Sequence, residues 1–181
     1  TITPAVRVKV TDAFTNPVAS ELVSLTLVGA GALSGYAPTA TDGSGIATFS
    51  TLSINLAGSK QLSASTSGAG PTLSASFTIS AGAAATVAFD VEPSNAAAGA
   101  AITPAVKVKV TDAFTNPVAT ELVSLSLVGT GTLSGNTPTA TDANGIATFS
   151  GLSVNLAGTK QLSASTTGAG PTLSANFTIT A

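Results

Sequence analysis

Six carboxylates occur at matching positions in the two halves of the sequence, and they are the residues that could most readily do chemistry. They are Asp12, Glu21, Asp42, Asp112, Glu121 and Asp142. Two facing carboxylates could act as the acid and base of a glycosidase, and several in one loop could bind Ca²⁺ through oxygen. An aspartate in a turn, however, commonly accepts hydrogen bonds from its own backbone. We therefore expect no enzymatic activity, no catalytic residue and no cofactor, and a Ca²⁺ site, if a loop has one, is expected at Asp12, Asp42, Asp112 or Asp142.

Two lysines at matching positions are the other candidates. Lys60 and Lys160 share strand parity with Leu62 and Leu162, and they should therefore face the edge of a core. A lysine there must extend its ammonium group to water, pair with a carboxylate or lose its charge. Its amine could also condense with a side-chain amide or carboxyl group, releasing ammonia or water and forming a covalent cross-link. The candidate partners for that bond are Asn16, Asn55, Asn116, Asn155, Asp12 and Asp112.

The composition excludes several other kinds of site. The 181 residues include no Cys and no His, which rules out thiol chemistry, disulfides, the usual zinc sites and a Ser-His-Asp triad. Six basic residues against eight acidic ones cannot neutralise a phosphate backbone, so nucleic acid is not an expected partner. No apolar run approaches the ~18 residues that would span a bilayer, so direct membrane insertion is not expected either.

The sequence repeats itself with an offset of 100 residues. Residues 2–81 align without gaps to residues 102–181, and 65 of the 80 aligned positions are identical. A period of this length fits one small domain better than a solenoid unit. The second copy is preceded by an alternating segment, 85–92, that has no counterpart before the first. We therefore predict a complete repeat at 83–181 and, at 1–82, a repeat that lacks its first strand.

Period-2 alternation of apolar residues predicts the elements that would position all these side chains. Seven strands are expected in the second copy, at 85–92, 106–111, 123–128, 133–141, 147–156 with a kink near 150–151, 161–165 and 172–180. Turn residues such as Asp142-Ala-Asn-Gly145 separate them, and no segment has helical periodicity. Seven short strands in about 100 residues are typical of an immunoglobulin-like sandwich. We therefore predict an all-β chain of two tandem immunoglobulin-like antiparallel β-sandwiches.

Three segments of the second copy resemble bacterial immunoglobulin-like repeats of the invasin/intimin type. They are 111–118, 139–149 and 156–164, with the sequences TDAFTNPV, TATDANGIATF and LAGTKQLSA. The resemblance implies an exported, extracellular or cell-surface protein with a spacer or adhesive role, and it carries over no catalytic residue. Such repeats often have Tyr where Lys60 and Lys160 stand, so the corner hydrogen bond of that Tyr is not expected here.

Two functions remain open. One is a structural repeat in an extended stalk or spacer of a bacterial surface protein. The other is a repeat unit of a self-assembling filament, sheath or surface layer, in which a strand from a neighbouring repeat or subunit completes the first copy. Under both, the partners are neighbouring immunoglobulin-like repeats of the same chain or of identical chains. A simpler interpretation of the missing strand is that the sequence has been trimmed at this boundary.

Overall fold

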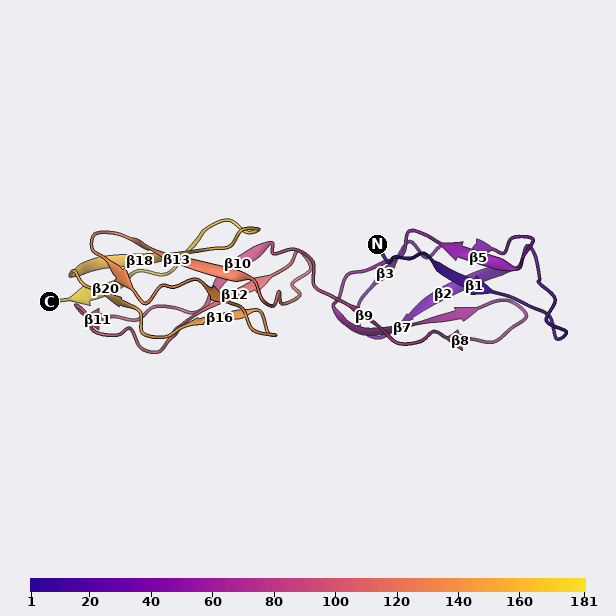
Figure 1. Ribbon diagram of the computed structural model, residues 1–181, viewed down its shortest axis with the longest axis horizontal. Coiled ribbons are helices and arrows are strands. Elements are labelled where there is room, and N and C mark those ends of the chain that lie inside the picture. The colour runs from indigo at the N-terminus through magenta and orange to yellow at the C-terminus, as the bar shows by residue number, and fades with distance from the viewer. The chain divides into compact units, whose positions relative to one another are not determined.

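The computed structural model describes all 181 residues and consists of β-strands joined by turns and loops. The chain forms two compact units, Thr1–Ser80 (unit 1) and Ala81–Ala181 (unit 2) (Figure 1). Each unit has its own apolar core, and each is described by itself below.

Unit 2 contains eleven short strands. They are β10 (Thr86–Val91), β11 (Ala96–Ala97), β12 (Val106–Thr111), β13 (Leu122–Val128), β14 (Leu133–Ser134), β15 (Thr139–Ala140), β16 (Ile146–Phe149), β17 (Ser153–Val154), β18 (Gly158–Ser165), β19 (Thr172–Leu173) and β20 (Phe177–Thr180). One layer has the order β10-β12-β16. The other has the order β11-β20-β18-β13-β15, with β19 also beside β18, and β14 pairs with β17. This is the predicted β-sandwich.

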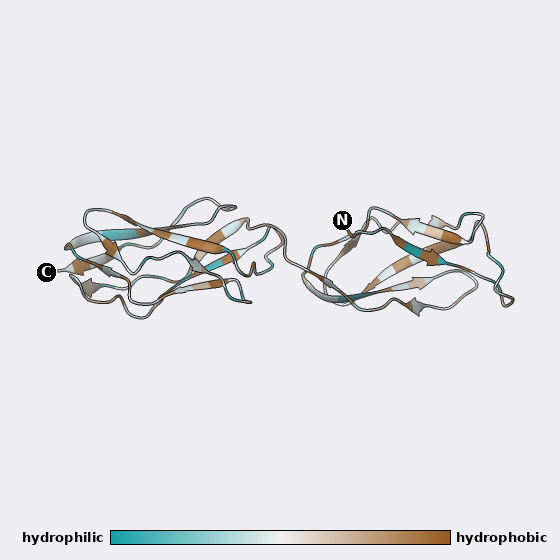
Figure 2. Cartoon of the chain, viewed as in Figure 1, coloured by the Kyte–Doolittle hydropathy of each residue, from teal (hydrophilic) through white to brown (hydrophobic).

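The core of unit 2 follows the predicted alternation. Val106, Val108 and Val110 on β12 are fully buried, and Val106 and Val108 pair with Phe149 and Ala147 on β16. Apolar residues of β13, β18 and β20 meet them from the other layer. Figure 2 shows hydrophobic residues interrupted by paler ones along the longer strands. Burying each such side chain contributes about 1.5–3 kcal/mol, so the Val and Leu positions account for much of the stability of the fold.

Three predicted strands are divided in the structure. The segment 147–156 forms β16 and β17, which lie on either side of the predicted kink near 150–151 and pair with β12 and β14. The segment 133–141 forms β14 and β15, which pair with different partners, β17 and β13. Between them lie Gly135, with φ of 78°, and Pro138, which has no N–H for a strand ladder. The segment 172–180 forms β19 and β20. Its parity changes between Ser174 and Phe177, which are both buried, while Leu173 is 54% exposed, so the single alternating strand expected over 172–180 is wrong.

One strand of unit 2 was not predicted, and it is parallel to its neighbour. β11 pairs with β20 in parallel, with Ala96 opposite Ile179. β11 consists of Ala96 and Ala97 alone, and two alanines give no apolar–polar alternation from which a strand could be predicted. The layer is therefore antiparallel except at this edge.

Unit 1 contains nine strands, and each has a counterpart in unit 2. They are β1 (Val6–Lys9), β2 (Leu22–Val28), β3 (Leu33–Ser34), β4 (Thr39–Ala40), β5 (Ile46–Phe49), β6 (Ser53–Ile54), β7 (Gly58–Ser65), β8 (Thr72–Leu73) and β9 (Phe77–Ile79). β1 pairs with β5, the order β4-β2-β7-β8 forms the second layer with β9 also beside β7, and β3 pairs with β6. Counterparts of β10 and β11 are the two elements that unit 1 does not contain.

Candidate functional site

The loop after β12 uses its aspartate to organise the backbone. Oδ1 of Asp112 accepts hydrogen bonds from the N–H groups of Phe114 (2.8 Å) and Asn116 (2.9 Å), and Oδ2 accepts one from Asn116 Nδ2 (2.8 Å). Asp12 forms the same three bonds in unit 1, at 2.9, 2.9 and 3.0 Å. Both carboxylates therefore act as turn-stabilising acceptors, which is the interpretation favoured by their sequence context.

The hairpin aspartates have a similar role. Oδ1 of Asp142 accepts the N–H groups of Asn144 (2.8 Å) and Ile146 (3.0 Å), and Asp42 has the equivalent bonds in unit 1. The bond from the Ile146 backbone is the main cause that holds the pKa of Asp142 below 3.8. No three Asp, Glu, His or Cys side chains come together as metal ligands. The structure thus does not bring the four candidate Ca²⁺ ligands together, and it bonds each of them to its own loop.

Asp112 has one partner that Asp12 does not. The N–H of Gly82, at the start of unit 2, donates to Oδ2 of Asp112 at 2.8 Å. Burial raises the pKa of Asp112, but the hydrogen bonds from Asn116 and Gly82 outweigh that effect and hold the pKa below 3.8. The pKa of Asp12 is also below 3.8, mainly because of the side-chain hydrogen bond from Asn16. The Asp112 loop therefore also fastens the segment that leads into β10.

Both candidate lysines are buried. Lys60 is 4% exposed and Lys160 is 2% exposed, and their Nζ atoms donate to the carbonyl oxygens of Ala57 (3.2 Å) and Ala157 (3.3 Å). Lys160 also donates to Oγ1 of Thr130 at 3.1 Å. These ammonium groups thus bind neutral oxygens at the edge of the core, rather than extending freely into solvent. Buried ammonium groups require such partners because an unpaired one would be strongly destabilising.

Glycines make room for these lysines. A Cβ at Gly129, which has φ of 129°, would lie 3.1 Å from Cδ of Lys160, and a Cβ at Gly158 would lie 3.4 Å from its Nζ. Gly29 and Gly58 have the same relationship to Lys60. At Gly29 and Gly129 an added Cβ would therefore crowd the lysine side chain, whereas at Gly58 and Gly158 it would make an ordinary contact.

The proposed cross-link partners are engaged elsewhere. Asn55 Oδ1 accepts the N–H of Ala32 at 2.8 Å, and Asn155 Oδ1 accepts the N–H of Thr132 at 2.7 Å. The amides of Asn16 and Asn116 donate to the loop aspartates already described. The hydrogen bonds of the lysine ammonium groups go to backbone carbonyl and hydroxyl oxygens, so these contacts favour unmodified lysines, and the mass of the intact protein tests the alternative of a cross-link.

The clearest difference between the units is the burial of identical side chains. A set of residues is buried in unit 2, whereas its counterparts in unit 1 are partly or fully exposed. The unit 1 members are Ile2, Val6, Val8, Val10, Asp12, Asn16, Ala64, Ala69, Ser74, Phe77 and Ile79. Because the amino acids are the same, the difference comes from what covers them.

In unit 2 these residues are covered by β10 and the chain that follows it. β10 pairs with β12, placing Val87 opposite Val110 and Phe89 opposite Val108. On its other side the Val87 carbonyl accepts a hydrogen bond of 2.7 Å from Oγ1 of Thr172. β10 therefore bridges the two layers and closes the core.

Residues 92–98 continue this cover along β20. Glu92 Oε2 accepts the N–H of Ala175 at 3.0 Å, and Asn95 Oδ1 accepts the N–H of Thr178 at 2.7 Å. The Ala98 N–H then donates to the backbone carbonyl oxygen of Thr180 at 2.8 Å. We call residues 84–98 the cover segment of unit 2. Sequence reasoning found its alternating part but missed its polar partners, because these bonds join residues 83 to 85 positions apart.

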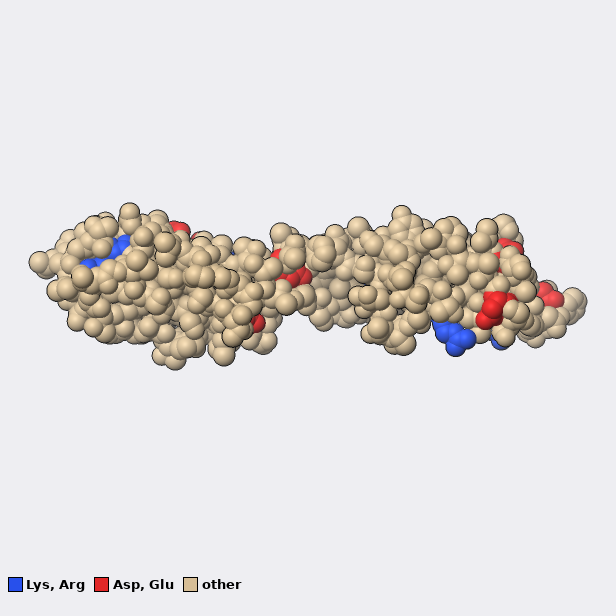
Figure 3. Space-filling view, turned by 90° about the horizontal axis from the view of Figure 1, so that it is seen from above, with Lys and Arg blue, Asp and Glu red and all other residues tan.

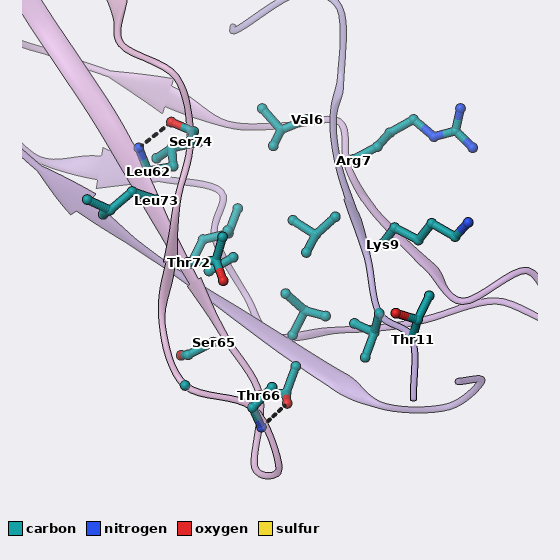
Figure 4. Close-up of a pocket in the computed structure, with 17 residues that line it drawn as sticks. Val6, Arg7, Lys9, Thr11, Leu62, Ser65, Thr66, Thr72, Leu73 and Ser74 are labelled. Carbon is teal, nitrogen blue, oxygen red and sulfur yellow. Dashed lines mark hydrogen bonds between the residues drawn. The ribbon is translucent and has the colours of Figure 1, made fainter. Parts of the chain in front are cut away.

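Unit 1 has two adjoining cavities where unit 2 has its cover segment. The first, of about 430 Å³, lies between β1 and β7–β8, and the second, of about 650 Å³, lies beside β9. They share Val6, Leu62 and Ser74 as lining residues, and together we call them the acceptor groove. Figure 4 shows Val6 pointing into the first cavity, whereas Arg7 and Lys9 point away from it.

The lining of the acceptor groove is nearly the same as that of its filled counterpart. Among the 17 residues around the first cavity, Arg7 is the single one whose counterpart differs, and that counterpart is Lys107. Around the second cavity the differing residues are Thr1, Ile54 and Ser80. The groove of unit 1 thus has the surface that binds a strand in unit 2, and it is the candidate functional site.

Comparison with solved structures identifies the fold. Yersinia pseudotuberculosis InvD is 20% identical over 97% of this chain and 51% of its own, with a TM-score of 0.52. Both units have the fold of bacterial immunoglobulin-like repeats of the invasin/intimin type. The D0-D1 domain of intimin (24% identity, 99% and 91% coverage, TM-score 0.42) and domains 4 and 5 of the S-layer protein SbsC (14%, 96% and 80%, 0.42) are also similar. The chain spans about half the length of the InvD chain.

Searches with protein-family models and among curated proteins find no match for the sequence. The structural similarity confirms, at the level of the fold, the resemblance expected from the three sequence segments. The chain contains no helix that could span a membrane.

Proposed function

We propose that the chain is a structural tandem repeat, which forms part of an extended stalk or spacer of a bacterial cell-surface or extracellular protein. The observation that carries this proposal is that the two units repeat the same fold-stabilising bonds. The aspartate loops, the hairpin caps and the buried lysines recur at an offset of 100 residues with closely similar distances. Repeating such a module adds length to a protein without adding a new reactive centre.

The surface supports the same role. Charged residues make up 8% of the sequence, and Figure 3 shows only scattered charged groups on the face in view. An exterior of Ser, Thr and Ala offers no charged patch for nucleic acid. The partners of this chain are, in this proposal, neighbouring immunoglobulin-like repeats, and the protein is extracellular.

The second candidate is a repeat unit of a self-assembling filament, sheath or surface layer. The acceptor groove favours it, because β1 pairs on one side with β5 and has no neighbour on the side that β10 occupies in unit 2. An open strand edge beside an apolar groove is a site for strand addition. A strand given by another repeat or subunit would close it.

Electron microscopy of the native assembly distinguishes the two candidates. Separate thin projections from the cell surface are the expected result for a stalk. A continuous lattice, or a filament with a regular subunit repeat, would contradict the stalk and support the second candidate.

A further inference from the structure

We propose that each unit has one neutral sheet face that docks against the same face on a second copy of this chain. This inference deepens the second candidate function, on which it rests, by naming the surface through which copies meet. The surface is the outward side of the layer that contains β13 and β18, and of the layer that contains β2 and β7 in unit 1. We call it the hydroxyl face. Its unit 1 members lie 100 positions before those of unit 2, which are Leu122, Ser124, Ser126, Val128, Ser163 and Leu173.

Strand pairing places these residues side by side on one surface. Ser163 on β18 lies opposite Ser126 on β13 and, on its other side, opposite Leu173 on β19. Paired residues of neighbouring strands project to the same side of a sheet. The intervening residues of β13, Val123 and Leu125, are buried in the core. The hydroxyl face is therefore the solvent side of its layer, with serines in the middle and apolar side chains at the margins.

Exposed apolar side chains are concentrated on this face. The chain exposes ten large apolar residues, and six of them are the Leu122, Val128 and Leu173 positions of the two units. Leu122 is 57% exposed and Leu22 is 58% exposed, so the same surface recurs in both units. Exposed apolar groups that gather on one surface and are rimmed by polar residues mark an interaction site.

The two outward sides of each sandwich differ in charge. The basic residues that are not buried all lie on β1 and β12, in the other layer, and they are Arg7, Lys9, Lys107 and Lys109. The members of the hydroxyl face include no ionisable side chain. Glu121 precedes β13 at one end of the face, where it accepts a hydrogen bond of 3.3 Å from Thr167. An uncharged partner surface therefore fits this face.

Hydroxyl groups make the face complementary to itself. In a symmetric dimer the residues near the two-fold axis meet their own copies. A serine hydroxyl both donates and accepts hydrogen bonds, so Ser126 and Ser163 can pair with the same residues of a second chain. Lys107 and Lys109 on the other layer cannot, because like charges repel each other. This difference selects a second copy as the partner of the hydroxyl face and argues against the opposite side of the sandwich.

The size of the face sets the strength of the contact. The seven residues of β13 extend over about 24 Å, and the four neighbouring strands β15, β13, β18 and β19 span about 19 Å at the usual strand spacing. Two copies that meet through one unit each would thus bury about 900 Å², which is less than the roughly 1,200 Å² of stable complexes. We expect a Kd of about 0.1–1 mM for one such contact, and stronger association where many repeats act together.

Sedimentation equilibrium of the whole 181-residue chain, between about 10 µM and 1 mM, tests the proposal. Reversible, concentration-dependent association is the expected result. Its Kd should change by less than about twofold between roughly 0.1 M and 0.5 M NaCl, because the contact contains no charged pair for salt to screen.

Charge-swap variants locate the contact. Thr26 is the counterpart of Ser126, and both are exposed. Combining Thr26→Lys with Ser126→Lys should weaken association by about tenfold or more, and so should combining Thr26→Glu with Ser126→Glu. Mixing the lysine variant with the glutamate variant should restore association and make it sensitive to salt, which misfolded variants could not do.

A matched control places the same charge on the other layer. Thr48 and Thr148 are exposed on β5 and β16. Combining Thr48→Lys with Thr148→Lys should leave the Kd unchanged, since these positions lie outside the hydroxyl face.

Several results would overturn the proposal. One is a chain that stays monomeric at about 1 mM, and if that monomer binds dextran through this face, the face is assigned to a neutral carbohydrate. Another is association that the lysine and glutamate variants leave unchanged, in which case the copies meet elsewhere and the second candidate function stands without this face. Association that depends on the face, in a protein whose native assembly consists of separate projections, contradicts the second candidate function and supports the face assignment.

Discussion

The backbone N–H of Gly82 donates a hydrogen bond of 2.8 Å to Oδ2 of Asp112, thirty residues further along the chain. This bond joins the start of unit 2 to the loop after β12, next to the place where the cover segment enters its groove. Asp12 has the same loop without such a donor. The bond between Gly82 and Asp112 therefore distinguishes unit 2, whose core is covered by residues 84–98, from unit 1, which has no such cover.

Replacing Asp112 with alanine should lower the stability of unit 2. The change removes the acceptor of the N–H groups of Gly82, Phe114 and Asn116, of which Asn116 is buried. A loss of about 2–3 kcal/mol in the free energy of unfolding is expected. This loss is measured by unfolding the protein in urea and monitoring unit 2 by hydrogen exchange. The matched variant Asp12→Ala should destabilise unit 1 by less, and an equal or greater loss there would contradict a role for the Gly82 bond.

Acid should weaken unit 2 through the same carboxylate. The folded state holds the pKa of Asp112 below 3.8, so at pH values near and below 3.8 the folded protein binds fewer protons than the unfolded chain. The stabilisation is therefore complete above this range and is lost as the pH falls through the folded pKa. Melting temperatures between pH 6 and pH 2 should show this decline. In Asp112→Asn the decline should be shallower, and an unchanged slope would exclude Asp112 as its source.

Alanine at Gly129 should destabilise unit 2 because of the buried lysine. The φ of 129° is unfavourable for any L-residue with a side chain, and the new Cβ would lie 3.1 Å from Cδ of Lys160. We expect a loss of about 1–3 kcal/mol in the free energy of unfolding, measured with denaturant. Gly170→Ala is the control, since nothing lies within 4 Å of its added Cβ. Equal effects of the two changes would refute the close passage of Lys160.

The mass of the intact protein should equal that of its sequence. Lys60 and Lys160 donate to the carbonyl oxygens of Ala57 and Ala157, and Asn155 accepts a backbone N–H from another loop. An unmodified lysine is what these contacts favour. Intact-protein mass spectrometry decides the question, and a deficit of one ammonia or one water per repeat would establish a cross-link.

The sequence alone predicted the repeat, the sandwich and the alternating strand at 106–111, because each depends on local alternation or on direct comparison of the two copies. It failed where a single residue interrupts a strand, as at Ser174, whose buried hydroxyl accepts the Leu162 N–H and turns Leu173 outward. The parallel pairing of β11 also escaped prediction, since two alanines have no periodicity. Long-range polar contacts, such as Thr172 with Val87, leave no local pattern at all.

The sequence predicted a repeat at 1–82 without its first strand, which a neighbouring repeat or subunit could complete, but it did not predict the geometry of the opening. The structure adds the geometry of the opening, with an unpaired side of β1 and a row of half-buried valines along it. The filled counterpart in unit 2 supplies the register and polar contacts of the missing strand.

Hydrogen exchange of the free 181-residue chain tests the central claim most directly, because each unit serves as the control of the other. If the groove of unit 1 is open, amides at residues 6–10 should exchange faster than those at 106–110, by about tenfold or more, since one side of β1 has no strand. Amides of β2 and β13, on the opposite layer, should differ less. Equal protection of 6–10 and 106–110 in the free chain would contradict the account.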